Sequence, residues 1–261
     1  MTGTLHHAAF GIYPYIALAV FFIGSLVRFD TDQYGWRSKS SQFLRRKQLV
    51  WGSILFHVGI LGLLAGHTVG LLTPIALFDG VGISHGFKQM LAILAGGLFG
   101  TVCFVGIVLL LHRRLFDSRI RKTSAPSDIA VLVILFLQLT LGMLTIPLSL
   151  GHPDGEEMVR FMSWAQGIVT FQPSASAYIE GVTWVFLAHI FLGMTIFLIF
   201  PFTRLVHVWS APVAYLTRRY QVVRTKVRPA AARDDDGLPP YVARPLPRPA
   251  PPPPVRREKA A

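Results

Sequence analysis

The chain has 261 residues, of which 52% are hydrophobic and only 15% are charged, and its formal net charge is +12. Soluble domains carry roughly 25% charged residues, so this deficit favours a membrane protein. The positive charge does not predict nucleic-acid binding, because the basic residues gather in short segments between apolar runs. The single cysteine, Cys103, excludes an internal disulfide, a thiolate zinc cluster, a Cys-ligated iron–sulfur centre and covalent haem attachment through CxxCH.

Five apolar segments are long enough to cross a lipid bilayer, which takes roughly 17–25 residues of helix. They are expected at residues 9–28, 48–72, 89–112, 128–149 and 182–207. The sequence therefore predicts an all-α membrane protein, a five-transmembrane-helix bundle in a domain of residues 1–227. Residues 228–261 are rich in proline and arginine and predict a disordered cytoplasmic tail.

Basic residues alternate between the gaps that separate these segments. Residues 29–47 and residues 113–127 each hold five Lys or Arg residues, whereas residues 73–88 hold only Lys88 and residues 150–181 hold only Arg160. By the positive-inside rule this alternation predicts an N-terminus outside and a C-terminus in the cytoplasm. A multi-pass membrane protein is expected. The stretch "MVRFMSWAQ" in the last outside gap is predicted to form a short amphipathic helix.

Four of the nine histidines lie within the predicted spans or at their ends, namely His57 and His67 on the second span and His189 and His207 on the fifth. Polar groups in a bilayer usually face the bundle interior and have a partner there. The two spans run in opposite directions, so His57 meets His207 by depth and His67 meets His189. Each pair could hold one haem iron as axial ligands. Packing and a proton path are the alternatives for a single membrane histidine.

Helix geometry supports this pairing only in part. The ten residues from His57 to His67 rise roughly 15 Å along a continuous helix, whereas the 18 residues from His189 to His207 rise roughly 27 Å. Tilted helices would be needed to match the two levels. The flanking small residues have two interpretations, close approach of a porphyrin or tight helix packing. They are Gly59, Gly62, Ala65, Gly66, Ala188 and Gly193.

Three arginines, Arg113, Arg114 and Arg204, fall at predicted cytoplasmic helix ends. There they could pair with haem propionates, although positive-inside anchors need no such role. Four histidines at two depths cannot converge on one zinc or copper ion.

Several stretches together resemble the gamma subunit, the membrane cytochrome b, of respiratory nitrate reductases. They include "LFHVGILGLLAGH", "LLLHRRLF", "LGMLTIPLS", "WAQGIVTF" and "HIFLGMTIFLIFPFTRLVHVWSAPVAYLTRRYQVVR", and the similarity spans about residues 10–227. The resemblance implies two noncovalent haems b. His57 and His207 would hold the haem near the cytoplasm, and His67 and His189 the haem near the periplasm.

The same resemblance implies that quinol is oxidised beside the periplasmic-side haem. Lys88 matches a family lysine at that site, with Gly66 and His67 adjacent, although Lys88 could also be an ordinary interfacial lysine. Electrons would pass to an iron–sulfur beta subunit docked on the cytoplasmic face, and a molybdenum-containing alpha subunit would reduce nitrate. The basic loops and "SAPVAYLTRRYQVVR" are candidates for the docking surface.

The chain departs from the family pattern in the tail after Arg228 and in the loop "DGVGISHGF", which leaves the quinone species open. One alternative function is a haem-b, quinone-linked subunit of a different reductase, such as one that acts on sulfur compounds. A histidine-bearing proton or solute transporter without haem is another, disfavoured by the lack of intramembrane acidic residues. A third is a haem-free anchor that recruits partners through its proline-rich tail.

Overall fold

The structure, a computed structural model, describes residues 3–32, 43–152, 154–210 and 217. Every regular element in these residues is a helix, and no β-strand occurs among them. Five helical segments are long and apolar enough to cross a membrane: Gly3–Asp32, Arg46–Leu72, His85–Phe116, Pro126–Leu150 and Trp184–Phe202. This confirms the prediction of an all-α, five-helix protein. The predicted tail at residues 228–261 lies outside the described residues.

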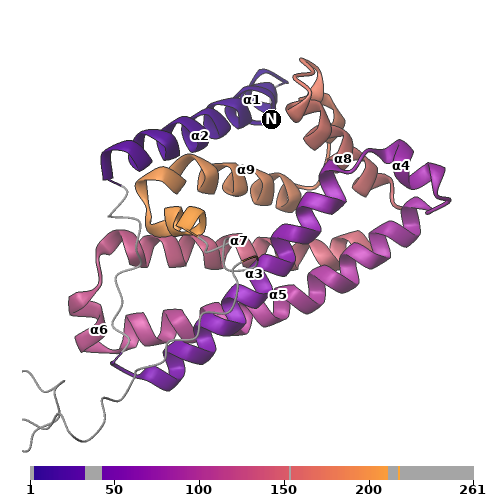
Figure 1. Cartoon of the computed structure of the whole chain (residues 1–261). Helices are drawn as coiled ribbons and strands as arrows, with labels where there is room; N and C mark the ends of the chain where they lie inside the picture. Colours follow the sequence, from indigo (N-terminus) through magenta and orange to yellow (C-terminus); the bar gives the residue numbers. More distant parts are fainter. Residues whose placement is uncertain (1–2, 33–42, 153, 211–216, 218–261) are drawn as a thin grey trace, which may run out of the picture. The chain divides into compact units, whose positions relative to one another are not determined.

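Short helices lie between the second and third, the third and fourth, and the fourth and fifth of these segments (Figure 1). The first comprises α1 (Gly3–His7), the π-helical η1 (Ala8–Ile12) and α2 (Tyr13–Asp32). The second and third are α3 (Arg46–Leu72) and α5 (His85–Phe116), with α4 (Ile75–Gly80) between them. The fourth is α7 (Pro126–Leu150), which α6 (Ser118–Thr123) precedes. The fifth is α9 (Trp184–Ile199), which follows α8 (Glu156–Val169) and the 3-10 turn η3 (Ala175–Ile179).

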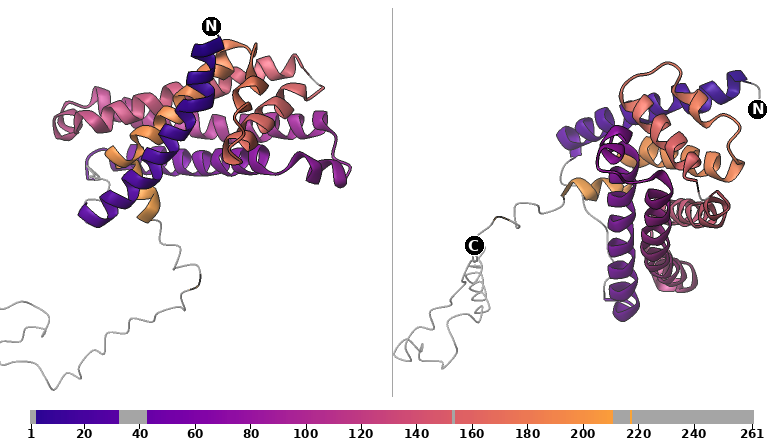
Figure 2. Two further views of the ribbon diagram at one scale, coloured as in Figure 1. Left: turned by 90° about the horizontal axis from the view of Figure 1, so that it is seen from above. Right: turned by 90° about the vertical axis from the view of Figure 1, so that its right-hand side faces the viewer.

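The spans pack one on the next in an order that leaves α3 and α9, which carry three of the four membrane histidines, with little direct packing on each other. Along the bundle α3 packs on α5, α5 on α7, α7 on α9 and α9 on α2 (Figures 1 and 2). Among the described residues, α3 and α9 make little contact with each other. The helices α4 and α8 lie at one end of the bundle, called the α8 end below. The short helix α6 lies at the opposite end, called the α6 end (Figure 1).

Glycines bring α3 and α5 close together. A Cβ added at Gly59 would lie 2.5 Å from the Cys103 backbone nitrogen, and one added at Gly62 would overlap the Phe99 ring. Small residues are common where membrane helices approach this closely. Of the two interpretations of these glycines, helix packing therefore applies to Gly59 and Gly62. Gly66 differs, because no atom lies within 4 Å of a Cβ built there.

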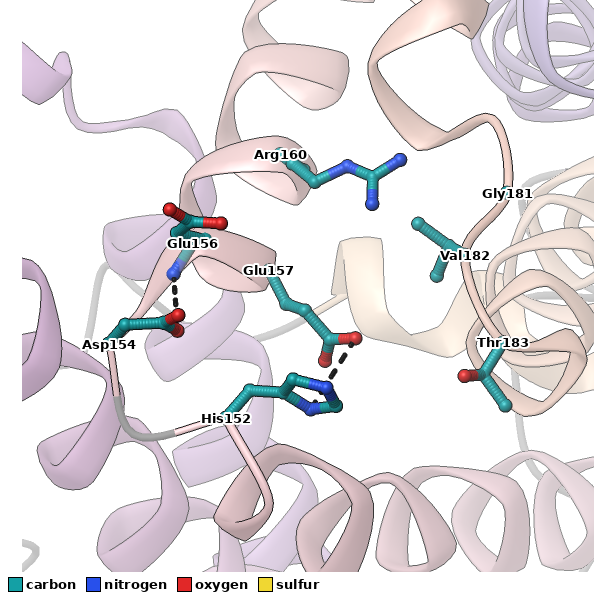
Figure 3. A pocket seen from close by; sticks show the side chains of 8 residues that line it. All are labelled: His152, Asp154, Glu156, Glu157, Arg160, Gly181, Val182 and Thr183. Carbon is teal, nitrogen blue, oxygen red and sulfur yellow. Dashed lines mark hydrogen bonds and ion pairs between the residues drawn. The ribbon is translucent and has the colours of Figure 1, made fainter.

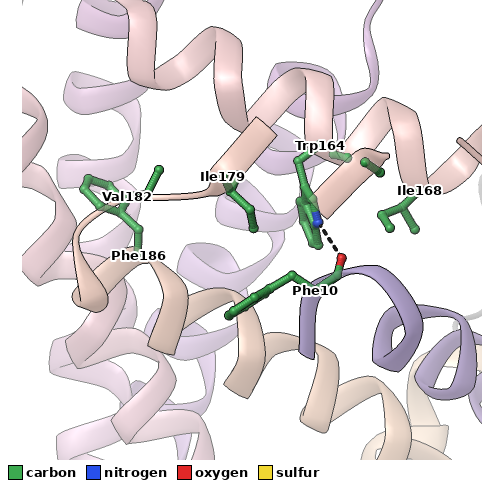
Figure 4. Close-up of a cluster of buried hydrophobic side chains, with 8 residues drawn as sticks. Phe10, Trp164, Ile168, Ile179, Val182 and Phe186 are labelled. Atoms are coloured by element: carbon green, nitrogen blue, oxygen red, sulfur yellow. Dashed lines mark hydrogen bonds between the residues drawn. The ribbon is translucent and has the colours of Figure 1, made fainter. Parts of the chain in front are cut away.

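The amphipathic helix expected around "MVRFMSWAQ" is present as α8. It begins after Gly155, whose positive φ of 81° and contact with the His85 backbone suit only a residue without a Cβ. Its apolar face joins a buried cluster that includes Phe10 and Trp164 (Figure 4). The Trp164 indole Nε1 donates to the Phe10 carbonyl oxygen at 2.9 Å. The buried cluster and this hydrogen bond fix α8 against the first span.

The fifth span is shorter than the sequence predicted. A continuous helix was expected to residue 207, but α9 ends at Ile199 and gives way to two 3-10 turns, η4 (Phe200–Phe202) and η5 (Arg204–Ser210). Pro201 explains the break, because proline lacks the amide hydrogen that a helix needs and its ring crowds the preceding turn. Thr203 is fully extended, with φ −120° and ψ 177°. His207 therefore follows a bend in the chain, so the roughly 27 Å rise of a continuous helix does not apply.

Asp117 links the α6 end of the bundle to the start of α3. Its Oδ1 accepts hydrogen bonds from the amides of Arg119 and Ile120 at 3.0 and 3.1 Å, and its Oδ2 lies 2.9 Å from the Arg45 Nε. The hydrogen bond from the Ile120 amide has the largest effect on the pKa of the Asp117 carboxyl group and lowers it. The Arg119 amide and the Arg45 charge lower this pKa further. The charged form is therefore the one that the folded protein stabilises.

We predict that Asp117→Asn lowers the melting temperature of the purified protein in detergent. Because the folded-state pKa is depressed, the contribution of Asp117 is complete above the unfolded aspartate pKa of about 3.9 and is lost as pH falls through the folded pKa. The difference between the two proteins should thus be full at pH 7 and shrink below about pH 4. Asp30→Asn, at an exposed position on α2, is the matched control. A pH-independent difference would contradict this prediction.

Candidate functional site

The structure brings the four membrane histidines together as two pairs. The ring centres of His57 on α3 and His207 on η5 are 6.2 Å apart, with ring planes at 75°. Those of His67 on α3 and His189 on α9 are also 6.2 Å apart, with planes at 41°. These are the two pairs that the depth of the residues in the membrane predicted. The helices α5 and α7 therefore separate α3 from the fifth span by a gap into which one imidazole from each side extends at each of the two levels.

Each of the four rings has the same hydrogen bond on Nδ1. The partners are backbone carbonyl oxygens, of Ser53 for His57 and Leu63 for His67 at 2.7 Å, of Gln138 for His189 at 3.1 Å, and of Arg204 for His207 at 2.6 Å. A carbonyl oxygen only accepts, so Nδ1 carries the hydrogen in all four rings. In a neutral ring Nε2 then keeps a lone pair that can bind a metal, although at His189 the Gln138 side-chain amide lies 3.5 Å from it. A metal-binding histidine usually has this arrangement, with one nitrogen donating to a carbonyl and the other facing the metal.

The separation within each pair fits a metal ion held between the two rings. A metal–nitrogen bond of about 2 Å on each side, with each ring centre about 1 Å behind its nitrogen, gives ring centres about 6 Å apart. Among the described residues, no group of three or more His, Cys, Asp or Glu side chains could hold a metal ion. Each pair therefore offers two ligands. This arrangement fits a haem iron, whose other four ligands belong to the porphyrin.

Contacts from α2 fix the bend that carries His207. The Arg28 guanidinium donates to the carbonyl oxygens of Pro201 at 2.6 Å and of Thr203 at 2.9 Å. The Trp209 indole lies 3.3 Å from the Ser25 hydroxyl oxygen. The two Arg28 bonds satisfy carbonyl groups that the interrupted helix leaves without their usual amide partners. The sequence did not single out Arg28 for this role, because an arginine at the end of an apolar segment looks like an ordinary positive-inside residue.

The three arginines predicted for haem propionates occupy two different places. The Arg114 and Arg204 guanidinium groups both lie near one Asp128 carboxylate oxygen, at 3.2 and 3.7 Å. Arg113 instead donates to the Leu44 carbonyl oxygen at 2.7 Å. Asp128 thereby holds two guanidinium groups together, and Arg204 lies on the same turn, η5, as His207. Burial lowers the pKa of Arg204, but an arginine stays protonated in proteins.

At the α8 end, Lys88 lies in the first turn of α5 and is only 5% exposed. Its Nζ is 4.3 Å from the centre of the Phe78 ring on α4, and it has no hydrogen-bond partner among the described residues. A buried ammonium group without an acceptor is costly and is common at binding sites. Near this lysine, the His85 Nε2 lies 3.0 Å from the Asp79 carboxylate, a contact that links the two ends of the loop between α4 and α5. Burial of Lys88 does not agree with an ordinary interfacial lysine.

A pocket of about 300 Å³ also opens at the α8 end (Figure 3). Among the described residues it is lined by His152, Asp154, Glu156, Glu157, Arg160, Gly181, Val182 and Thr183. The His152 Nδ1 lies 3.8 Å from the Glu157 carboxylate, and the Arg160 Nε donates to the Tyr178 carbonyl oxygen at 2.9 Å. None of the residues predicted for the functional site lines this pocket, so it is separate from the histidine pairs.

Fold and site together define a multi-pass membrane protein with two histidine pairs between its second and fifth spans. Residues 6–226 match the family model of the nitrate reductase gamma subunit, and the chain belongs to that family. This confirms the family resemblance seen in the sequence motifs.

Individual relatives agree with the family assignment. The chain is 52% identical over 217 residues to the respiratory nitrate reductase 1 gamma chain of Escherichia coli (strain K12), covering 83% of this chain and 96% of the relative. It is 43% identical over 216 residues to the nitrate reductase gamma chain of Bacillus subtilis (strain 168), with the same coverage. It is also 28% identical over 171 residues to an Hdr-like menaquinol oxidoreductase cytochrome b-like subunit of Archaeoglobus profundus, covering 61% of this chain and 47% of the relative.

Proposed function

We propose that this chain is a dihaem cytochrome b that oxidises membrane quinol at the α8 end and supplies electrons to a nitrate reductase at the α6 end. The observation that carries the proposal is the pair of facing imidazoles at each of two levels. In both pairs the ring centres are 6.2 Å apart, and every Nδ1 is bound to a carbonyl oxygen. Family membership supports the same assignment.

His57 and His207 would hold the haem nearer the α6 end, and His67 and His189 the haem nearer the α8 end. When bound, the two haems supply one-electron carriers at two depths of the membrane. The carbonyl partners hold each ring in one tautomer and one orientation, which would leave Nε2 available to the iron. Arg114 and Arg204, which Asp128 holds together close to His207, are the guanidinium groups that would pair with a haem propionate there.

Lys88 would bind the quinol. Its buried ammonium group can donate a hydrogen bond to a quinol oxygen, and its charge stabilises the anion that forms as the hydroxyl proton leaves. Phe78 covers the ammonium and offers an apolar wall for a quinone ring. Gly66 fits this site because the space beside it is open, next to His67. The A. profundus relative, named as part of a menaquinol oxidoreductase, supports quinol as the substrate class.

The distribution of basic residues gives the orientation that we propose. Described Lys and Arg residues are dense at the α6 end, at Arg45, Arg46, Lys47, Arg113, Arg114, Arg119, Arg121 and Lys122. Between the spans at the α8 end there are Lys88 and Arg160. Under the positive-inside rule the α6 end lies in the cytoplasm and the α8 end faces the periplasm of a bacterial inner membrane. Protons from quinol are then released outside.

The cytoplasmic α6 end is the proposed docking face for an iron–sulfur beta subunit, which passes electrons to a molybdenum-containing alpha subunit. The basic loops at this end support docking of an acidic surface. The segment "SAPVAYLTRRYQVVR" also remains a candidate, and all but Ser210 and Thr217 of it lies outside the described residues. The name of the A. profundus relative supports a second candidate function, a quinol-linked subunit of a different reductase.

The reduced-minus-oxidised visible spectrum of the purified protein tests the proposed function. We expect a b-type haem band and about two haems per chain by extraction, because each histidine pair supplies both axial ligands for one iron. A spectrum without a b-type band would contradict the proposal and favour a haem-free transporter or anchor. Two haems with no turnover on nitrate in the assembled complex would instead favour a different terminal reductase.

We predict that Lys88→Ala slows quinol oxidation by about 10-fold or more while both haems are retained, because the variant loses the donor and charge at the quinol oxygen. The measurement is quinol-driven haem reduction, compared with reduction by a small artificial donor that bypasses the quinol site. Lys47→Ala, an exposed lysine at the α6 end, is the control and should behave like the parent protein. Unchanged quinol kinetics in Lys88→Ala would reject the assigned role of this lysine.

A further inference from the structure

His189 differs from the other three histidines in where its Nδ1 hydrogen bond goes. His57, His67 and His207 donate to a carbonyl oxygen three or four residues earlier in their own segment. His189 lies on α9 but donates to the Gln138 carbonyl oxygen on the neighbouring helix α7, at 3.1 Å. The orientation of this one ring therefore depends on how closely α7 and α9 pack.

Gly142, one helical turn after Gln138, sets that approach. A Cβ added at Gly142 would lie 2.9 Å from the His189 Cε1 and 3.5 Å from its Nδ1. Two carbons in contact sit about 3.5–4.0 Å apart, so the ring would have to move away from α7. The absence of a side chain at residue 142 is what lets the imidazole reach the Gln138 carbonyl group.

The Gln138 side chain lies on the other side of the same ring. Its Nε2 is 3.5 Å from the His189 Nε2, and a Cβ added at Gly193 on α9 would lie 3.2 Å from that same amide nitrogen. Gly142 on α7 and Gly193 on α9 thus both lie at the α7–α9 interface, but the neighbouring side chains differ. Gly142 meets the imidazole itself, whereas Gly193 meets the flexible side-chain amide of Gln138.

We infer that Gly142 is a positioning residue for His189, which it holds against the Gln138 carbonyl group in the ring orientation of the His67–His189 pair. The inference rests on the proposed haem ligation by that pair. A hydrogen bond from Nδ1 to a carbonyl oxygen makes an imidazole a stronger electron donor to a metal, which favours the oxidised iron. The contact at Gly142 therefore bears on the potential of one haem and on the angle between its two axial rings.

Gly142→Ala tests this inference in the assembled, membrane-embedded complex. We expect the methyl group to push the ring away from α7 and to lengthen or break its hydrogen bond to Gln138. Redox titration should show a higher midpoint potential for one haem only. The EPR spectrum of the oxidised protein, which depends on the angle between axial imidazole planes, should change for that same haem. The signal of the other haem, from His57 and His207, should not change. Loss of that one haem with the other retained would equally support the inference.

Gly193→Ala is the matched control, because it adds the same methyl group to the same α7–α9 interface without touching the imidazole. Both haem potentials and both EPR signals should match the parent protein. If Gly142→Ala binds no haem, the control decides: retained haems in Gly193→Ala assign the loss to the contact with His189, and loss in both variants overturns the inference.

Failure of the inference is distinguishable from failure of the proposed function. A parent protein with two haems, together with a Gly142→Ala variant whose two potentials and EPR signals are unchanged, would overturn only the role of Gly142. Equal shifts of both haems would overturn it as well. A parent protein without b-type haem would refute the proposed function itself.

Discussion

The hydrogen bond between an imidazole Nδ1 and a backbone carbonyl oxygen is the interaction on which the rest of the site depends. An imidazole in a bilayer has no water to satisfy both nitrogens, so its polar groups must find partners within the protein. Here the helix backbone supplies the acceptor. In α3 the acceptor is four residues back, and in the 3-10 turn η5 it is three residues back, as the pitch of each element requires. The second nitrogen is thereby left for a metal.

The break at Pro201 matters because it brings His207 to the depth of His57. A straight helix could not place both residues of the fifth span at the levels of the two α3 histidines. Arg28 stabilises the bend by donating to two carbonyl oxygens, and α2 thereby takes part in positioning His207. A helix that carries none of the four membrane histidines thus helps to position one of them.

The sequence was sufficient to predict the spans and the partner of each histidine, because apolar length and depth in the membrane are properties of the chain itself. Contacts between helices were not predictable in this way. Gly59 and Gly62 proved to pack on α5, and Asp128 had no distinctive pattern although it pairs with both Arg114 and Arg204. The end of α9 was mispredicted because hydropathy stays high through the "FPF" segment, and a proline outweighs hydropathy in deciding where a helix stops.

The most direct test replaces each of the four histidines by alanine in turn and identifies which haem each variant loses, by its potential and EPR signal. We predict that His57→Ala and His207→Ala lose one and the same haem, and that His67→Ala and His189→Ala lose the other. Loss of the same haem from His57→Ala and His67→Ala would contradict the pairing between α3 and the fifth span, and with it the two-level arrangement proposed for electron transfer.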